Sequence, residues 1–180
     1  MKPFNTKERF SIPNLMGYFR LLLIPVFCYL YLAKEAYHWA AGVVLLSSLT
    51  DLFDGKIARK YNMVTNFGKF MDPLADKCLV MAALCWFVEN GDMVGWVLAV
   101  VLLREFAVSG MRLVAVEKGR VIAAAWSGKV KTASTMVCIC LMLFGIPHWL
   151  NLVCQAVILV TTVYSGVEYF VKNWDVFRDS

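Results

Sequence analysis

The sequence contains few charged residues. Only 17% of its 180 residues are Asp, Glu, Lys or Arg, and 60% are apolar or aromatic, compared with about 25% and roughly 45–50% in an average soluble domain. This apolar excess is too large for the core of an ordinary soluble domain. The net charge of +5 does not indicate nucleic-acid binding, because the basic residues flank apolar stretches and form no separate basic domain.

Signals of several other protein classes are missing as well. The chain has no internal repeat and no low-complexity run, and its six cysteines show no C-x-x-C spacing. We therefore expect the cysteines to be buried small apolar residues. A cleavable signal peptide is not expected, because Arg20 interrupts the first apolar stretch. The two histidines, His38 and His148, fall away from the acidic residues and are assigned no catalytic role.

Long apolar runs dominate the chain instead. A helix needs roughly 20 mostly apolar residues to cross a hydrocarbon layer about 30 Å thick. Six stretches meet this requirement: about 14–33, 39–59, 70–90, 93–117, 129–146 and 149–171. Open strands would leave unpaired backbone groups in lipid. The sequence therefore predicts an all-α integral membrane protein, a six-helix transmembrane bundle forming one domain over residues 1–180, with residues 1–13 either lying on the membrane surface or unstructured.

The basic residues predict the orientation of this bundle. Of the 18 Lys and Arg residues, only Lys34 falls on the side that holds the turns at 34–38, 90–92 and 145–148. The positive-inside rule makes that side external. Both termini are then cytoplasmic, as are the loops at 60–69 and 117–128.

Four aspartates interrupt the apolar pattern. The segment from Asp51 to Arg59 reads DLFDGKIAR and is followed by Gly68, Asp72 and Asp76. Residues three and four apart share one face of a helix, and a short loop makes the second and third spans antiparallel neighbours, so we expect the four carboxylates to converge. Their repulsion must be relieved by protonation or by bound cations. Hard oxygen ligands favour Mg²⁺, which also binds substrate phosphates.

Small residues and one cation accompany these acids. Gly55, Ala58 and Gly68 leave room either for a ligand or for close helix packing. Arg59 can hold a diphosphate through two parallel hydrogen bonds, or it can simply mark the cytoplasmic end of the second span. An alternative function is a cation transporter, which would use such acids to bind the transported ion. Arg59 argues against it, because an arginine beside the ion path would repel the cation.

Asp72 also allows a purely structural interpretation. It precedes Pro73, and Asp and Pro are both favoured at the start of a helix, so Asp72 could begin the third span. That role would not explain Asp76.

The spacing of these residues resembles the signature of the CDP-alcohol phosphatidyltransferases, D-x2-D-G-x2-A-R-x8-G-x3-D-x3-D, at all eight fixed positions. Members of this family are six-span membrane enzymes that transfer a phosphatidyl-type group from a CDP-activated donor to an alcohol and release CMP. The resemblance implies two divalent ions, Mg²⁺ or Mn²⁺, held by Asp51, Asp54, Asp72 and Asp76. It also implies a homodimer, with Asp76 acting as the base toward the acceptor hydroxyl.

The resemblance assigns a donor site as well. Asp54, Gly55, Ala58, Arg59 and Gly68 would bind CDP-diacylglycerol, with the small residues letting the nucleotide approach the helix backbone and Arg59 contacting its phosphates.

Other stretches resemble one bacterial branch of the family, the phosphatidylglycerophosphate synthases of the cytoplasmic membrane, whose acceptor is glycerol 3-phosphate. They are IPN at 12–14, FR at 19–20, LIP at 23–25, REF at 104–106 with Arg112, and GKVKT at 128–132. The alternatives within the same chemistry are phosphatidylglycerol, inositol phosphate or serine as acceptor.

An anionic acceptor also requires cations for the phosphate that is not transferred. Arg104, Arg112, Lys129 and Lys131 are the candidates, although the lysines could merely flank a span and Arg104 could pair with a carboxylate. Glu105 must be neutralised too. We expect its partner on another span, because adjacent helical residues point in different directions.

Overall fold

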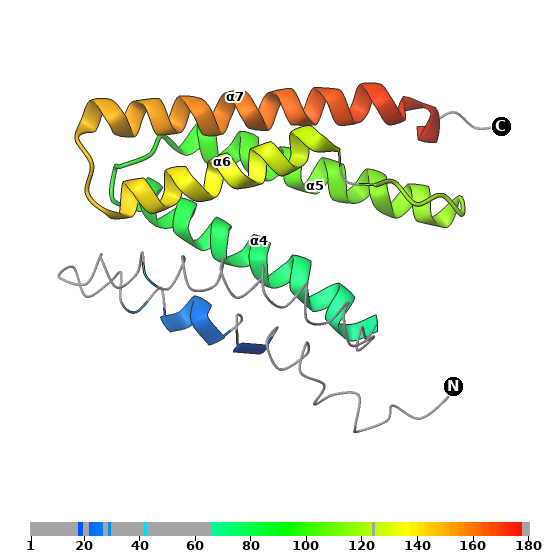
Figure 1. Ribbon diagram of the computed structural model, residues 1–180, viewed down its shortest axis with the longest axis horizontal. Helices are drawn as coiled ribbons and strands as arrows, with labels where there is room; N and C mark the ends of the chain where they lie inside the picture. The colour runs from blue at the N-terminus through cyan, green and yellow to red at the C-terminus, as the bar shows by residue number, and fades with distance from the viewer. Residues whose placement is uncertain are drawn as a thin grey trace. The chain divides into compact units, whose positions relative to one another are not determined.

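The computed structural model describes residues 18–19, 22–26, 29, 42, 66–123 and 125–177, with side chains left out at 66–73 and 76. No strand occurs in this part of the chain, and its order of elements is α4 (Asn66–Glu89), α5 (Gly95–Glu117), α6 (Trp126–Leu143), α7 (His148–Asn173) and the 3-10 helix η1 (Trp174–Phe177) (Figure 1). The all-helical expectation is confirmed for these residues.

The chain divides into two compact units, residues 1–83 and 84–180, and each is described by itself. In the first unit, residues 22–26 are helical and lie within the first expected span. Most of α4, from Asn66 to residue 83, also belongs to this unit. Most of the expected spans at 14–33 and 39–59 lies outside the described residues. The second unit contains the last residues of α4 together with α5, α6, α7 and η1.

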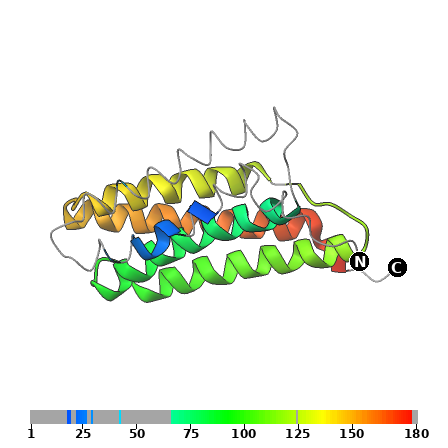
Figure 2. The same cartoon turned by 90° about the horizontal axis from the view of Figure 1, so that it is seen from below.

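In the second unit, α7 packs against both α5 and α6. Figures 1 and 2 show α6 running antiparallel to α5 and α7, and Figure 2 shows α7 between α5 and α6. The buried positions of α7 recur every three or four residues, as expected for one face of a helix. They are Asn151, Cys154, Gln155, Ile158, Thr162, Ser165 and Tyr169, so the central face of this unit is partly polar.

Glycines end the helices where the sequence predicts breaks. Gly91, Gly119 and Gly145 have φ values of 80°, 71° and 70°. At the end of α5, the N–H of Gly119 donates to Val116 and that of Arg120 to Ala115, which is the paired pattern of a Schellman cap. At the other end of the helix, the Gln155 side chain of α7 accepts a hydrogen bond from the Val94 N–H at 3.1 Å. The glycine turns thus follow the ends of α4, α5 and α6.

Among the described residues, one helical stretch, His148–Phe177, is long and apolar enough to cross a membrane. The other helices overlap the expected spans but carry charged side chains, including Arg104, Glu105 and Arg112 in α5, which lower their hydropathy. The number of spans and the orientation of the termini stay predictions.

The cysteines are only partly as expected. Cys138, Cys140 and Cys154 are buried, whereas Cys78 is half-buried and Cys85 is exposed. The prediction of burial is therefore wrong for Cys85.

Candidate active site

Part of the aspartate motif lies on α4. Gly68, Asp72 and Asp76 are four residues apart on this continuous helix, so their backbone positions follow one stripe. Because α4 begins at Asn66, Asp72 lies inside the helix, and the interpretation of Asp72 as the residue that starts the third span is wrong.

The rest of the motif, at 51–59, lies outside the described residues. This applies to the candidate residues Asp51, Asp54, Gly55, Ala58 and Arg59. The side chains that the structure does describe include no group of three His, Cys, Asp or Glu residues suited to a metal ion. The predicted metal and donor sites therefore stay predictions.

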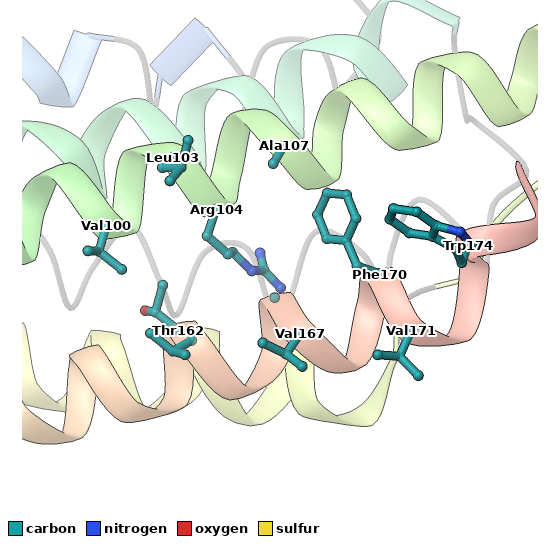
Figure 3. A pocket seen from close by; sticks show the side chains of 11 residues that line it. Val100, Leu103, Arg104, Ala107, Thr162, Val167, Phe170, Val171 and Trp174 are labelled. Atoms are coloured by element: carbon teal, nitrogen blue, oxygen red, sulfur yellow. The ribbon is translucent and has the colours of Figure 1, made fainter. Parts of the chain in front are cut away.

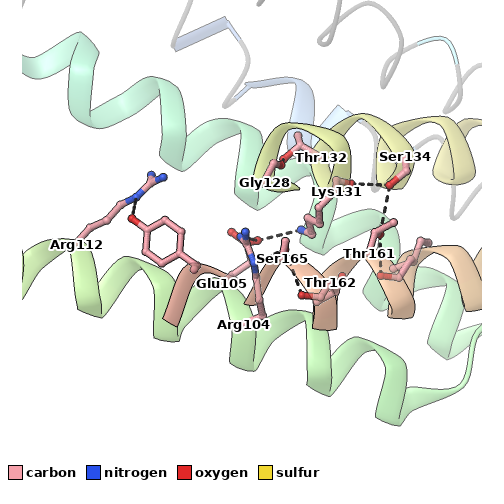
Figure 4. Close-up of polar contacts among 12 residues, drawn as sticks. Arg104, Glu105, Arg112, Gly128, Lys131, Thr132, Ser134, Thr161, Thr162 and Ser165 are labelled. Atoms are coloured by element: carbon pink, nitrogen blue, oxygen red, sulfur yellow. Dashed lines mark hydrogen bonds and ion pairs between the residues drawn. The ribbon is translucent and has the colours of Figure 1, made fainter. Parts of the chain in front are cut away.

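The second unit brings two of the predicted cations together around Glu105. Its Oε1 atom accepts hydrogen bonds from Arg104 Nη1 at 2.7 Å and from Lys131 Nζ at 2.9 Å. The three side chains are only 13% (Arg104), 12% (Glu105) and 5% (Lys131) exposed. Figure 4 shows α5 and α6 joined through this carboxylate. Buried charges need such partners, because each would otherwise lose its hydration without compensation.

This arrangement corrects one expectation and confirms another. Glu105 does pair with a cation on another helix, Lys131 of α6. It also pairs with its neighbour Arg104, which was the alternative interpretation of Arg104 but not the partner expected for Glu105. Adjacent helical residues do diverge at Cβ, but the long arginine side chain bends back far enough for its guanidinium to reach the glutamate.

Helix α7 directs the path of Arg104. The Nε atom donates to Ser165 Oγ at 3.1 Å. A Cβ atom added at Gly166 would lie 3.2 Å from Arg104 Cγ, and one at Gly128 of α6 would lie 3.5 Å from Nη2. Small residues on two helices therefore leave the space through which Arg104 passes.

The other two predicted cations are placed differently. Arg112 donates from Nε to the Tyr169 hydroxyl at 2.7 Å, and its guanidinium carbon lies 5.4 Å from the centre of that ring. Arg104 and Arg112, about two turns apart on α5, thus both reach α7, as their shared face predicts; their contacts there, Ser165 and Tyr169, are about one turn apart. Lys129 is exposed in the first turn of α6.

A groove of about 830 Å³ lies beside Arg104, between α5 and α7. Figure 3 shows the Arg104 side chain crossing from α5 toward α7 within it. The remaining lining is mostly apolar: Val100, Leu103, Ala107, Thr162, Val163, Gly166, Val167, Phe170, Val171 and Trp174. The aliphatic stem of Arg104 thus faces an apolar surface, while its head belongs to the polar network.

The sequence interpretation missed Ser165, Gly166 and Tyr169. The available signal was a run of small and polar residues, Thr161, Thr162, Ser165 and Gly166, inside an otherwise apolar helix. Such residues in membrane helices favour close packing and hydrogen bonds between helices.

Comparison with known proteins gives a consistent result. The CDP-alcohol phosphatidyltransferase family matches residues 10–166. A Bacillus subtilis (strain 168) protein named CDP-diacylglycerol--glycerol-3-phosphate 3-phosphatidyltransferase is 40% identical, covering 95% of this chain and 99% of its own length. A protein of the same name from Shigella flexneri serotype 5b is 36% identical over 89% of this chain and 93% of its own.

A further relative comes from Mycobacterium tuberculosis (strain H37Rv) and is named a probable phosphatidylglycerophosphate synthase. It is 38% identical, covering 90% of this chain and 81% of its own length. The family match covers most of the chain, including the whole aspartate motif and the Arg104–Glu105–Lys131 network. The chain therefore belongs to the CDP-alcohol phosphatidyltransferase family.

Proposed function

We propose that this protein transfers the phosphatidyl group of CDP-diacylglycerol to sn-glycerol 3-phosphate, giving phosphatidylglycerophosphate and CMP for phosphatidylglycerol and cardiolipin synthesis. The observation that carries the proposal is the aspartate motif, unbroken at its eight fixed positions, in a chain aligned over almost its full length with relatives named for this reaction.

The motif aspartates are assigned to two divalent ions. The ligands are Asp51, Asp54, Asp72 and Asp76, and their carboxylate oxygens suit Mg²⁺, or Mn²⁺ in its place. The continuity of α4 supports the assignment, because it keeps positions 72 and 76 one turn apart on one stripe. When bound, the metal would supply charge neutralisation for the donor diphosphate and for the departing CMP.

The chain's own residues perform the remaining tasks. Asp76 takes the proton of the acceptor's 1-hydroxyl while that oxygen forms a bond to the lipid-linked phosphorus and the bond from phosphorus to CMP breaks. Arg59 contacts the donor phosphates, and Gly55, Ala58 and Gly68 leave room for the nucleotide. Catalysis of this kind depends mainly on positioning and charge stabilisation.

The basic cluster is assigned to the phosphate of the acceptor that is not transferred. Lys131 is buried and Arg104 half-buried, and Arg112 and Lys129 lie on the same two helices. A phosphate in a partly desolvated site needs charged hydrogen-bond donors at short range. The meeting of two cations from different helices at Glu105 supports this role better than isolated flanking lysines would.

The protein is assigned to the bacterial cytoplasmic membrane as a six-span, single-domain homodimer with its active site and both termini facing the cytoplasm. Exposed tryptophans at the two ends of the second unit support two membrane interfaces: Trp96 and Trp149 at one end, Trp126 and Trp174 at the other. The basic residues of the 118–131 segment lie at the latter end, in agreement with a cytoplasmic location. Light scattering of the detergent-solubilised protein would test the dimer.

Measuring CMP release tests the activity. The purified protein is supplied with CDP-diacylglycerol, Mg²⁺ and, one at a time, glycerol 3-phosphate, phosphatidylglycerol, inositol phosphate, serine or no acceptor. The proposal expects Mg²⁺-dependent CMP release with glycerol 3-phosphate above all others. Release with a different acceptor would keep the chemistry and change the substrate, whereas acceptor-independent or absent release would overturn the enzyme assignment.

A further inference from the structure

Glu105 stands between two largely shielded cations of the second unit, Arg104 and Lys131. One oxygen, Oε1, accepts from Arg104 Nη1 and from Lys131 Nζ, so the two donor nitrogens must lie within two hydrogen-bond lengths of each other. Two positive charges at that separation repel each other. Both side chains are shielded from solvent, with Lys131 only 5% exposed, and a carboxylate shared between them offsets the repulsion.

Because Arg104 and Lys131 are shielded from solvent, losing the Glu105 carboxylate would leave their charges uncompensated. Removing one member of a buried ion pair leaves an uncompensated charge, which is strongly unfavourable. Long basic side chains respond by extending toward water. Arg104 and Lys131 would therefore separate, and a ligand that needs both would find them misplaced.

The space over Gly166 is the second requirement. The Arg104 side chain passes so close to α7 that a Cβ at Gly166 would lie 3.2 Å from Cγ, in the middle of the side chain. The Ser165 hydroxyl accepts from Nε beside this point. A methyl group at position 166 would therefore shift the stem and, with it, the guanidinium that meets Glu105.

We propose that Glu105 is a positioning residue for the acceptor phosphate: it holds Arg104 and Lys131 at one point, and Gly166 provides the space that lets Arg104 reach it. The inference rests on the proposed function, because the phosphate is that of glycerol 3-phosphate. Glu105 does not touch the phosphate, which it would repel. It acts through the two cations.

The experiment compares Glu105→Gln, Glu105→Asp and Gly166→Ala with the wild type in purified protein. Gly110→Ala is the matched control, because a Cβ there would meet nothing within 4 Å. The measurements are the KM for glycerol 3-phosphate, the KM for CDP-diacylglycerol, kcat and the melting temperature. Glu105→Gln should raise the acceptor KM about tenfold or more, the value of one misplaced charged hydrogen bond, with the donor KM unchanged.

The other variants make the result specific. Glu105→Asp keeps the charge and should have an acceptor KM between those of the wild type and Glu105→Gln. Gly166→Ala should raise the acceptor KM severalfold, and Gly110→Ala should leave it unchanged. If Glu105→Gln does not fold, Gly166→Ala decides the question by the same comparison.

Three results would overturn the inference: an unchanged or lowered acceptor KM in Glu105→Gln, an equal rise in both KM values, or equal behaviour of Gly166→Ala and Gly110→Ala. A lowered acceptor KM would mean that Glu105 merely competes with the phosphate. A wild type that releases no CMP with glycerol 3-phosphate would instead overturn the proposed function, and the inference with it.

Discussion

The acidic and basic regions of this protein are assembled in different ways. The four aspartates belong to one short segment between Asp51 and Asp76, at spacings of three or four residues on either side of a predicted loop. The basic network joins α5 to α6 through Lys131 and α5 to α7 through Ser165. Helix periodicity alone predicts that each pair of aspartates lies on one stripe of its own helix, whereas the basic network depends on how three helices pack.

This difference separates the expected effects of substitutions. A change in the acidic segment should act on metal, donor or proton transfer and leave the acceptor's affinity largely intact. A change in the basic network should act on the acceptor, and it can do so from a residue such as Gly166 that carries no charge.

The largest effect is expected at the proposed base. Asp76→Asn should lower the rate of CMP release by about 10²- to 10⁴-fold, the usual range for losing a general base, because an amide fills the space but takes no proton. Donor binding should remain measurable, and excess Mg²⁺ should not restore the rate. Turnover close to wild type, or full recovery at high Mg²⁺, would remove Asp76 from the role of base.

The next largest effect is expected in the basic network, on the KM for glycerol 3-phosphate. Lys131→Met should raise the KM for glycerol 3-phosphate about ten- to a hundredfold, because a charged hydrogen bond contributes roughly 1.5–3 kcal/mol. Lys129→Met should have a smaller effect, because Lys129 is exposed and solvent screens its charge. The donor KM should change little in either variant.

Plain glycerol distinguishes a phosphate contact from a general fault in the enzyme. It should be a poor acceptor for the wild type and no worse for Lys131→Met. An equal loss of activity with glycerol and with glycerol 3-phosphate would mean that Lys131 stabilises the fold or binds the donor. The assignment of the basic network to the acceptor phosphate would then be wrong.

The same difference explains how much could be predicted from the sequence. The spans expected at 70–90, 93–117, 129–146 and 149–171 agree within four residues with α4 to α7, because long apolar runs and turn glycines are local signals. Contacts between helices are not local. Tyr169 meets Arg112, and Ser165 meets Arg104, only because α5 and α7 run parallel in one register, which neither helix's own sequence specifies.

A smaller effect within the aspartate motif is expected for Asp51→Asn. The variant loses one of four proposed oxygen ligands, so the Mg²⁺ concentration at half-maximal activity should rise about tenfold, and excess Mg²⁺ should restore the rate. Asp92→Asn is a suitable control, because Asp92 is exposed in the turn before α5 and outside the motif. An unchanged midpoint in Asp51→Asn would count against its role as a metal ligand.

The smallest effect is expected for an ion pair outside both regions. Arg120 and Asp175 form a salt bridge between the loop after α5 and η1, with side chains 47% and 58% exposed. Solvent and salt screen such a pair, and ordering two mobile side chains opposes it. Arg120→Ala, Asp175→Ala and the double variant should therefore share the wild-type melting temperature and both KM values. A raised acceptor KM in Arg120→Ala alone would contradict this expectation and extend the basic region to the loop after α5.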